Sequence, residues 1–217
     1  MKRQFAVIGL GRFGASLSKT LVAHGHEVMA VDSDYDKVQD AISDRVATHA
    51  VQLDATDEDA LLAVGIKNFD TVIVAIGTHR EDSILISLML KDIGITNIIA
   101  KALDKKHGKV LEKIGVNRVI YPEIDMGVRI AHNLMSNTLD YFEIAPEYSI
   151  VDIKALDFMH NRSLSQLKLR EKHRVTVLAI KRNKADVFVP VSSEVILPED
   201  ILVILGHNRD LEALYET

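Results

Sequence analysis

Short apolar runs rich in valine and isoleucine alternate with amphipathic stretches through the first 121 residues. Each run has the length and β-branched composition of a strand that is buried on both faces. The six runs are Phe5–Ile8, Val28–Val31, His49–Leu53, Thr71–Ile76, Asn97–Lys101 and Arg118–Tyr121. Between them, apolar residues recur three and four positions apart, as in Leu17, Leu21 and Val22, which is helical spacing. This alternation predicts an α/β fold with a doubly wound parallel sheet of the Rossmann type.

Glycines follow several of the predicted helices at the position where a left-handed residue ends a helix. Gly25 follows the first helix, and Gly94 and Gly115 follow later ones. Glycine suits this position because it has no Cβ to clash in the left-handed conformation. The local helix ends therefore agree with the alternation of strands and helices.

A second, smaller domain is predicted after the parallel sheet. A helical pattern that starts at Glu123 is broken by the segment around Pro146. We place the first domain at residues 1–138, including this crossover helix, and the second at residues 139–217. The second domain shows strand patterns and one short helical segment near Leu164–Leu169, which predicts a small α+β unit. Its predicted strands are Ser149–Ala155, Arg174–Lys181, Asp186–Val191 and Ile201–Leu205.

The composition of the chain excludes several kinds of site and partner. The chain has 217 residues, a formal net charge of −5 and no cysteine. The lack of cysteine excludes disulfides, thiolate zinc sites and a cysteine nucleophile. Because the net charge is negative and lysines and arginines form no stripe, nucleic acid is not an expected partner. No apolar stretch reaches the ~20 residues of a membrane span, so we expect a cytoplasmic protein that meets the membrane through a partner.

The strongest motif is a glycine-rich turn between the first strand and the first helix. Its residues are Gly9, Leu10, Gly11, Arg12, Phe13 and Gly14. Glycines at this spacing permit a tight turn, close approach of a phosphate to the backbone, and close packing of the helix. The helix that follows offers unpaired N–H groups and the positive end of its dipole to an anion. Because strand, turn and helix occur in this order, the motif predicts a nucleotide site.

An acidic residue follows at the position where such sites bind ribose. Asp32 ends the second strand, 18 positions after Gly14, close to the ~20 residues typical of the fingerprint. There it would accept hydrogen bonds from the ribose hydroxyls and repel a 2′-phosphate, which disfavours NADP. The alternative is that Asp32 caps the next helix, a task that Ser33 or Asp34 would fill equally well.

Two further charged residues each have an ordinary alternative. Arg12 lies inside the glycine turn, where its guanidinium could reach a terminal phosphate, but it could also be a surface arginine. Glu123 follows Pro122 at a helix start, where the helix dipole favours an acid whatever the function. The residues alone leave the role of Arg12 open, whereas for Glu123 they favour the helix start, and a metal role would need other support.

The third predicted strand ends in Asp54, Ala55 and Thr56. These residues could present an acceptor to the amino group of adenine. Thr56 with Asp59 also resembles a helix N-cap, and of the two interpretations capping is the safer.

The sequence shows no motif of a catalytic domain beside the nucleotide site. It has no GxSxG elbow, no P-loop and no HExxH, and its histidines lack metal-ligand spacing, which argues against an enzyme. Two alternatives nevertheless fit the glycine turn and Asp32. One is an NAD(H)-dependent oxidoreductase, and the other is a soluble redox or energy sensor that binds NADH.

Agreement spread along the chain resembles a known family. The segments that carry it are Phe5–Gly14, Gly25–Val28, Val31–Asp32, Val72–Gly77, Lys113–Gly115, Pro122–Gly127 and Ala179–Lys181. In them the chain is similar to the regulatory RCK subunits of Ktr and Trk potassium uptake systems, of the KtrA type. The resemblance implies homodimers that assemble into a homo-octameric ring. It also implies docking on a membrane potassium-translocating subunit of the KtrB or TrkH type.

The same resemblance assigns ligands. ATP and ADP would favour different ring shapes, with Arg12 at the γ-phosphate of ATP and Asp32 at the ribose. Glu123 would help to bind a divalent cation, Mg²⁺ or Ca²⁺, between paired subunits. Motif and resemblance together predict a site for ATP or ADP, with NAD(H) as the alternative ligand. Its residues are Gly9, Gly11, Arg12, Phe13, Gly14, Asp32, Ser33, Asp54, Ala55, Thr56, Ala75 and Ile76.

The C-terminal module of this family dimerises and, in many Gram-positive members, binds cyclic di-AMP. Arg170 and Pro190 stand where residues that contact this effector are expected. The chain departs from the family at His173 and Arg174, which replace an aromatic-glycine pair. The resemblance therefore implies cyclic di-AMP as a second effector.

Overall fold

The protein divides into two compact units, Met1–Ile124 and Asp125–Thr217, as seen in a computed structural model. The structure describes residues 2–135, 139–183 and 186–215. The predicted domain boundary after residue 138 borders on residues 136–138, which lie outside the described ranges. Helix α6 (Pro122–Met135), predicted as part of the first domain, belongs to the second unit from Asp125 onward. There the Arg129 guanidinium forms a two-pronged ion pair with the Asp140 carboxylate, with the shortest N–O distance 2.6 Å.

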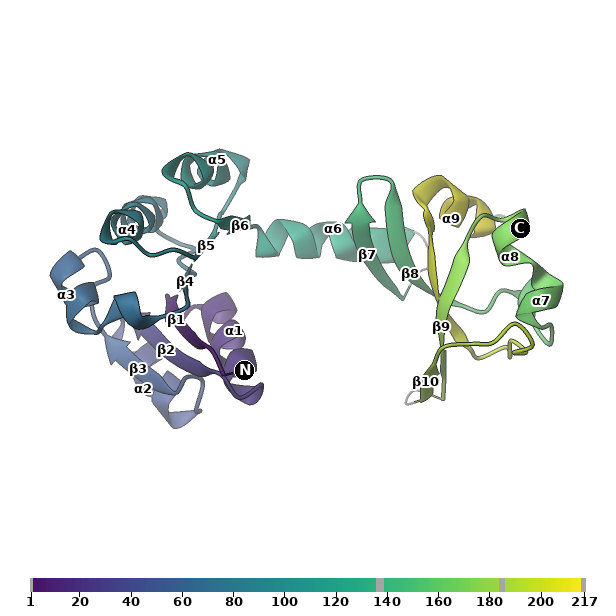
Figure 1. The fold of residues 1–217 in the computed structure, drawn as a ribbon, viewed down its shortest axis with the longest axis horizontal. Coiled ribbons are helices and arrows are strands. Elements are labelled where there is room, and N and C mark those ends of the chain that lie inside the picture. The colour runs from purple at the N-terminus through teal and green to yellow at the C-terminus, as the bar shows by residue number, and fades with distance from the viewer. Residues whose placement is uncertain (1, 136–138, 184–185, 216–217) are drawn as a thin grey trace. The chain divides into compact units, whose positions relative to one another are not determined.

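The first unit is built on a six-stranded sheet (Figure 1). Its strands are β1 (Gln4–Ile8), β2 (Glu27–Asp32), β3 (His49–Gln52), β4 (Thr71–Val74), β5 (Ile98–Lys101) and β6 (Arg118–Ile120). All neighbouring pairs are parallel, and the order is β3-β2-β1-β4-β5-β6. This order confirms the predicted doubly wound sheet. The chain reverses its direction of winding between β1 and β4, and ligands of such sheets bind at that point, beyond the carboxyl ends of the strands.

Helices cover both faces of this sheet. They are α1 (Arg12–Ala23), α2 (Tyr35–Ser43), α3 (Glu58–Ala63), α4 (Arg80–Ile93) and α5 (Lys105–Ile114). Val7 of β1 packs with α1, and its neighbour Ala30 of β2 packs with α2. On the opposite face, Ile8 belongs to one cluster with buried residues of α3, α4 and α5. The four central strands β2, β1, β4 and β5 are therefore buried on both sides, which explains their largely apolar sequences.

The predicted glycine helix ends are confirmed. Gly94 and Gly115 end α4 and α5 in the left-handed region, each with a φ of 93°. Gly25 lies one residue beyond the C-cap of α1 with a φ of 83°. A residue with a Cβ would be strained in this conformation.

The second unit is an antiparallel sheet with short helices, as expected for a small α+β domain. The strands are β7 (Asp140–Ala145), β8 (Tyr148–Lys154), β9 (Thr176–Arg182), β10 (Asp186–Phe188) and β11 (Ile201–His207). They lie in the order β10-β9-β11-β8-β7. The helices are α7 (Leu164–Leu167), α8 (Leu169–Lys172) and α9 (Asn208–Tyr215).

Strand β7 and helix α9 of this unit were not predicted. Strand β7 contains Asp140 and Glu143 and lies at the sheet edge, and the segment around Pro146 is the turn that joins it to β8. Helix α9 spans two turns and buries only Leu211 and Leu214. Strand β7 is apolar at four of six positions but buries only Tyr141, and helix α9 is too short to show a clear helical period, so each element depends on its contact with the sheet.

Candidate nucleotide site

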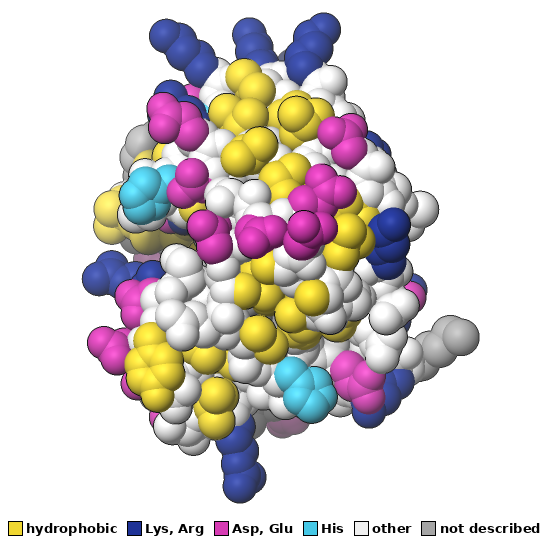
Figure 2. All heavy atoms as spheres, turned by 90° about the vertical axis from the view of Figure 1, so that its left-hand side faces the viewer, with side chains coloured by type: hydrophobic (Ala, Val, Ile, Leu, Met, Phe, Trp, Pro, Cys, Tyr) yellow, Lys and Arg dark blue, Asp and Glu magenta, His cyan; other side chains and the backbone are white. Residues whose placement is uncertain are grey.

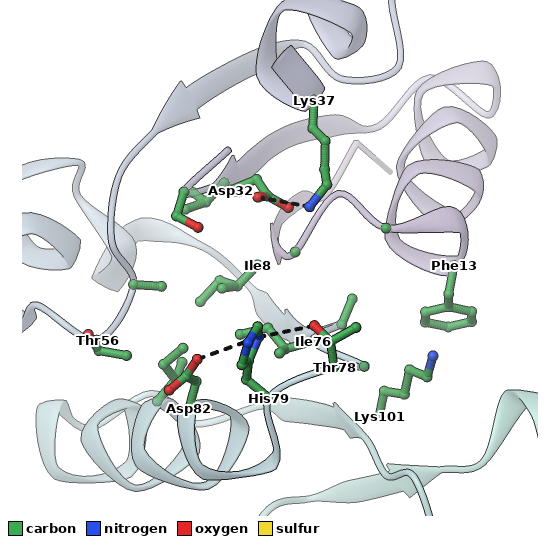
Figure 3. Close-up of a pocket in the computed structure, with 18 of the residues that line it drawn as sticks. Ile8, Phe13, Asp32, Lys37, Thr56, Ile76, Thr78, His79, Asp82 and Lys101 are labelled. Atoms are coloured by element: carbon green, nitrogen blue, oxygen red, sulfur yellow. Dashed lines mark hydrogen bonds and ion pairs between the residues drawn. The ribbon is translucent and has the colours of Figure 1, made fainter. Parts of the chain in front are cut away.

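A cavity of about 530 Å³ opens beyond the carboxyl ends of β1, β2 and β4 (Figure 3). Its volume lies in the roughly 300–1,000 Å³ range of small-molecule sites. The lining residues are Ile8, Gly9, Gly11, Arg12, Phe13, Val31, Asp32, Ser33, Lys37, Leu53, Asp54, Ala55, Thr56, Ala75, Ile76, Gly77, Thr78, His79, Asp82, Ile86, Lys101 and Glu123. Every predicted nucleotide-site residue except Gly14 is among them, as is Glu123. The structure thus brings together residues that are spread over more than a hundred positions.

The three motif glycines serve different purposes. Gly9 has a φ of 103°, and a Cβ on Gly14 would lie 1.9 Å from the carbonyl oxygen of Gly9. The fold itself therefore requires both of these glycines. At Gly11, by contrast, an added Cβ would meet no protein atom within 4 Å. The bare backbone of Gly11 faces open space in the cavity, which is what close approach of a phosphate needs.

The first turn of α1 forms an electropositive end of the cavity. Its N-cap is Gly11, which supplies no side-chain cap, and the first turn contains no acidic residue. The N–H groups of a first helical turn have no partner within the helix and favour an anion. Arg12 is exposed there and forms no hydrogen bond or ion pair with any described residue. This end of the cavity can therefore bind a phosphate group.

Asp32 lines the cavity at the end of β2 and organises the glycine turn. Its Oδ2 accepts the N–H of Leu10 at 2.7 Å, and its Oδ1 accepts the N–H of Asp34 at 2.9 Å. The Lys37 ammonium lies 3.4 Å from Oδ1. Because each carboxylate oxygen can accept two hydrogen bonds, Oδ2 retains one position for a ribose hydroxyl. Asp34, and not Asp32, caps α2 by accepting the N–H groups of Asp36 and Lys37.

The segment after β3 differs from the predicted capping arrangement. Asp57, one residue before α3, accepts the N–H of Ala60 at 3.2 Å, so the predicted cap by Thr56 with Asp59 is wrong. The Thr56 hydroxyl donates instead to Asp54 at 2.7 Å. This hydrogen bond and the one from the Thr56 N–H lower the pKa of Asp54. Asp54 thus stays ionised, with part of its acceptor capacity used within its own turn.

A buried lysine lies at the phosphate end of the cavity. The side chain of Lys101, at the end of β5, is only 9% exposed, and its ammonium lies 2.6 Å from Oε1 of Glu123. Glu123 stands in the first turn of α6 and is 66% exposed. The hydrogen bond from Lys101 lowers the pKa of Glu123. Within the described ranges, no group of three metal-ligating side chains accompanies Glu123.

Several lining residues were missed by the sequence analysis. Lys37 and Lys101 supply positive charge, and Thr78, His79 and Asp82 form a hydrogen-bonded and ionic group at the start of α4 (Figure 3). Lys101 could have been found, because it closes an apolar strand pattern at the edge of the sheet where ligands bind. The segment from Thr78 to Asp82 shows no motif of its own.

Family models match both units of the chain. Residues 5–122 match the TrkA-N domain and residues 150–217 match the TrkA-C domain. Ktr system potassium uptake protein C of Bacillus subtilis is 47% identical over 212 residues, covering 97% of this chain and 95% of that protein. The chain belongs to the Ktr and Trk family of potassium uptake regulators. Ktr system potassium uptake protein A of the same organism is also 47% identical, over 97% of this chain and 94% of that protein.

Solved structures show the same fold in more distant proteins. The GsuK RCK domain aligns with a TM-score of 0.71 and 17% identity, over 100% of this Ktr-type chain and 47% of that chain. The GsuK channel aligns with a TM-score of 0.72 and 17% identity, over 99% of this chain and 39% of the channel chain. This chain thus spans less than half of either. In the described ranges of this chain, no helix has both the length and the apolar composition that crossing a membrane requires.

The residues predicted to contact cyclic di-AMP lie in the second unit of this Ktr-type chain. Arg170 is exposed on α8, and Pro190 follows the end of β10 by two residues. Arg174 has a φ of 57°, in the left-handed region that favours glycine. The His173 ring packs near Phe158, with centroids 5.7 Å apart. Binding of cyclic di-AMP stays a prediction.

Proposed function

We propose that this Ktr-type regulator binds ATP and ADP in the cavity and transmits the difference between them to a membrane potassium-uptake subunit. The observation that carries the proposal is the open first turn of α1 with Arg12 beside it, in a chain 47% identical to potassium uptake proteins. A ligand shifts a conformational equilibrium only by its difference in affinity for the two states. Contact of Arg12 with the γ-phosphate, which ADP lacks, supplies that difference. No catalytic role is part of this proposal.

The regulator would act as a homo-oligomer at the inner face of the membrane. Helix α6 exposes Met126, Val128, Ile130 and Leu134, and Leu134 is 81% exposed. Leu85 and Leu88 of α4 are also exposed. Figure 2 shows hydrophobic side chains grouped beside acidic ones on the side of the first unit that bears α3 and α4. Apolar surface of this kind supports self-association into dimers and, as the family resemblance implies, an octameric ring. The partner would be a KtrB- or TrkH-like subunit.

The predicted divalent cation is only partly supported by the residues present. Mg²⁺ and Ca²⁺ are held by several oxygen ligands. Glu123 offers one carboxylate, whose Oε1 is engaged by Lys101. This chain alone therefore does not fit a cation site, and the other ligands would have to come from a second copy or the nucleotide. Cyclic di-AMP near Arg170 and Pro190 is likewise proposed from the family resemblance.

Calorimetric titration of the purified chain with ATP, ADP and NADH in one buffer tests the nucleotide proposal. Solved GsuK structures include one bound to NAD and one bound to ADP, so both ligand types belong in the test. We expect tight binding of ATP and ADP and weak binding of NADH. A clear preference for NADH would overturn the proposal in favour of an oxidoreductase or redox sensor. Light scattering after size exclusion tests assembly, and a monomer under every nucleotide condition would contradict the ring.

A further inference from the structure

Lys101 is a buried positive charge whose partner lies at the surface. Its side chain is 9% exposed, whereas that of Glu123 is 66% exposed, although the two form one ion pair. The Lys101 ammonium lies 6.0 Å from the centroid of the Phe13 ring, in the first turn of α1. In Figure 3 Lys101 points toward Phe13. The buried ammonium is therefore directed at the same end of the cavity as the free N–H groups of α1.

The surroundings of Lys101 leave room for its ammonium but supply few other partners. A Cβ on Gly77 would lie 2.9 Å from Nζ, so the absence of a side chain there makes space for the charge. A buried charge is costly unless an anion or hydrogen-bond acceptors accompany it. Glu123 meets that need from the solvent side. If another anion replaced Glu123 as the partner of Lys101, the Glu123 carboxylate would be hydrated at its exposed position. Release of Glu123 from Lys101 therefore costs little free energy.

We propose that Lys101 binds the phosphate chain of the nucleotide and that Glu123 is a positioning residue that holds the Lys101 side chain until the nucleotide arrives. This inference rests on the proposed nucleotide function of the cavity and adds a residue that the glycine motif does not contain. It assigns Glu123 an action through Lys101 that requires no divalent cation. The two roles of Glu123 separate when divalent cations are removed.

The test is calorimetric titration of the full chain with ATP and with ADP in buffer containing EDTA. Lys101→Met should weaken both nucleotides by about tenfold or more, since a charge-assisted contact is lost. Glu123→Gln should strengthen both by roughly fivefold, because the anion that competes for the Lys101 ammonium is gone. In the double variant, Glu123→Gln should add nothing to Lys101→Met. Lys19→Met, which removes an exposed charge outside the cavity lining, is the matched control and should change neither affinity.

Each result has one interpretation. Unchanged affinity in Lys101→Met overturns the phosphate role of Lys101. A gain from Glu123→Gln that persists in the double variant overturns its action through Lys101 and indicates direct repulsion of the phosphates. Lys101→Arg should retain affinity. If thermal melting shows that Lys101→Met does not fold, Lys101→Arg and Glu123→Gln, which changes an exposed side chain, still test the proposal. If the unaltered chain binds neither nucleotide, the proposed function fails, and not merely this inference.

Discussion

The carboxylate of Asp32 accepts a hydrogen bond from the backbone N–H of Leu10 at 2.7 Å. This bond ties the end of β2 to the glycine turn that follows β1. Asp32 therefore shapes the loop on which the phosphate site depends, while its Oδ2 keeps one acceptor position free. A binding role and a loop-shaping role must be separated by the choice of ligand and of variant.

For the ribose role, we expect the chain to bind ATP more tightly than 2′,3′-dideoxy-ATP by about 1.5–3 kcal/mol, the range for hydrogen bonds to a charged group. Asp32→Ala should abolish that preference in calorimetric titrations. Asp32→Asn is the control for the loop, because its side-chain oxygen can still accept the Leu10 N–H. Equal affinity of the unaltered chain for both nucleotides would show that Asp32 serves the loop alone.

Gly11 and Gly14 form a matched pair of positions for an added methyl group. Gly14→Ala should lower the free energy of unfolding by about 1–3 kcal/mol or more, because its Cβ overlaps the Gly9 carbonyl. Gly11→Ala should change stability far less than Gly14→Ala, since its φ of −66° suits alanine and its Cβ would meet no protein atom within 4 Å. We expect Gly11→Ala instead to weaken ATP. Urea unfolding and calorimetry measure the two effects, and full ATP affinity in Gly11→Ala would contradict the placement of the phosphates.

Arg12 is predicted to distinguish ATP from ADP. Arg12→Ala should weaken ATP by about 1.5–3 kcal/mol more than ADP, because only ATP carries the γ-phosphate. Arg12→Lys keeps a positive charge without the two-pronged geometry, so its loss of ATP affinity should be smaller than that of Arg12→Ala. Competition titrations with ATP and ADP measure the affinity of each variant for both nucleotides. An equal loss for ATP and ADP would rule out the γ-phosphate contact.

The stability of the first unit should depend on pH through His107. This side chain is buried in α5, and burial, with a smaller contribution from Arg80, lowers its pKa below the ordinary 6.5. The unfolded chain therefore takes up a proton at a higher pH than the folded one. Stability contributed by neutral His107 is complete above about pH 6.5 and is lost as pH falls toward the folded pKa.

His107→Asn isolates this contribution. Asparagine does not titrate, and its side-chain oxygen can replace Nδ1 as the acceptor of the Leu103 N–H. Urea unfolding between about pH 5 and 8 should show a flatter dependence of stability on pH in the variant than in the unaltered chain. Parallel curves would mean that His107 does not titrate on unfolding.

Local patterns predicted much of the fold but little of the detail in the site. The six parallel strands and the ends at Gly94 and Gly115 depend on residues a few positions apart, so periodicity and backbone sterics were sufficient. The cap of α3 was misassigned because Asp57 and Thr56 are both good caps, and only the start of the helix at Glu58, with Asp57 accepting the Ala60 N–H, separates them. Strand β7 was missed because it lies directly after the predicted domain boundary, and an edge strand depends on pairing with its neighbour, here β8.

By itself, the sequence determined the doubly wound sheet, the glycine turn and the place of Asp32 at the end of β2, because each follows from local backbone preferences. Only the tertiary structure decided that Asp32 holds the Leu10 N–H and that Glu123 engages a buried Lys101. Each of these contacts joins residues 22 positions apart. The order of strands in the sheet brings the segments that follow them together, and no pattern along the chain encodes the distance between groups that lie on different elements.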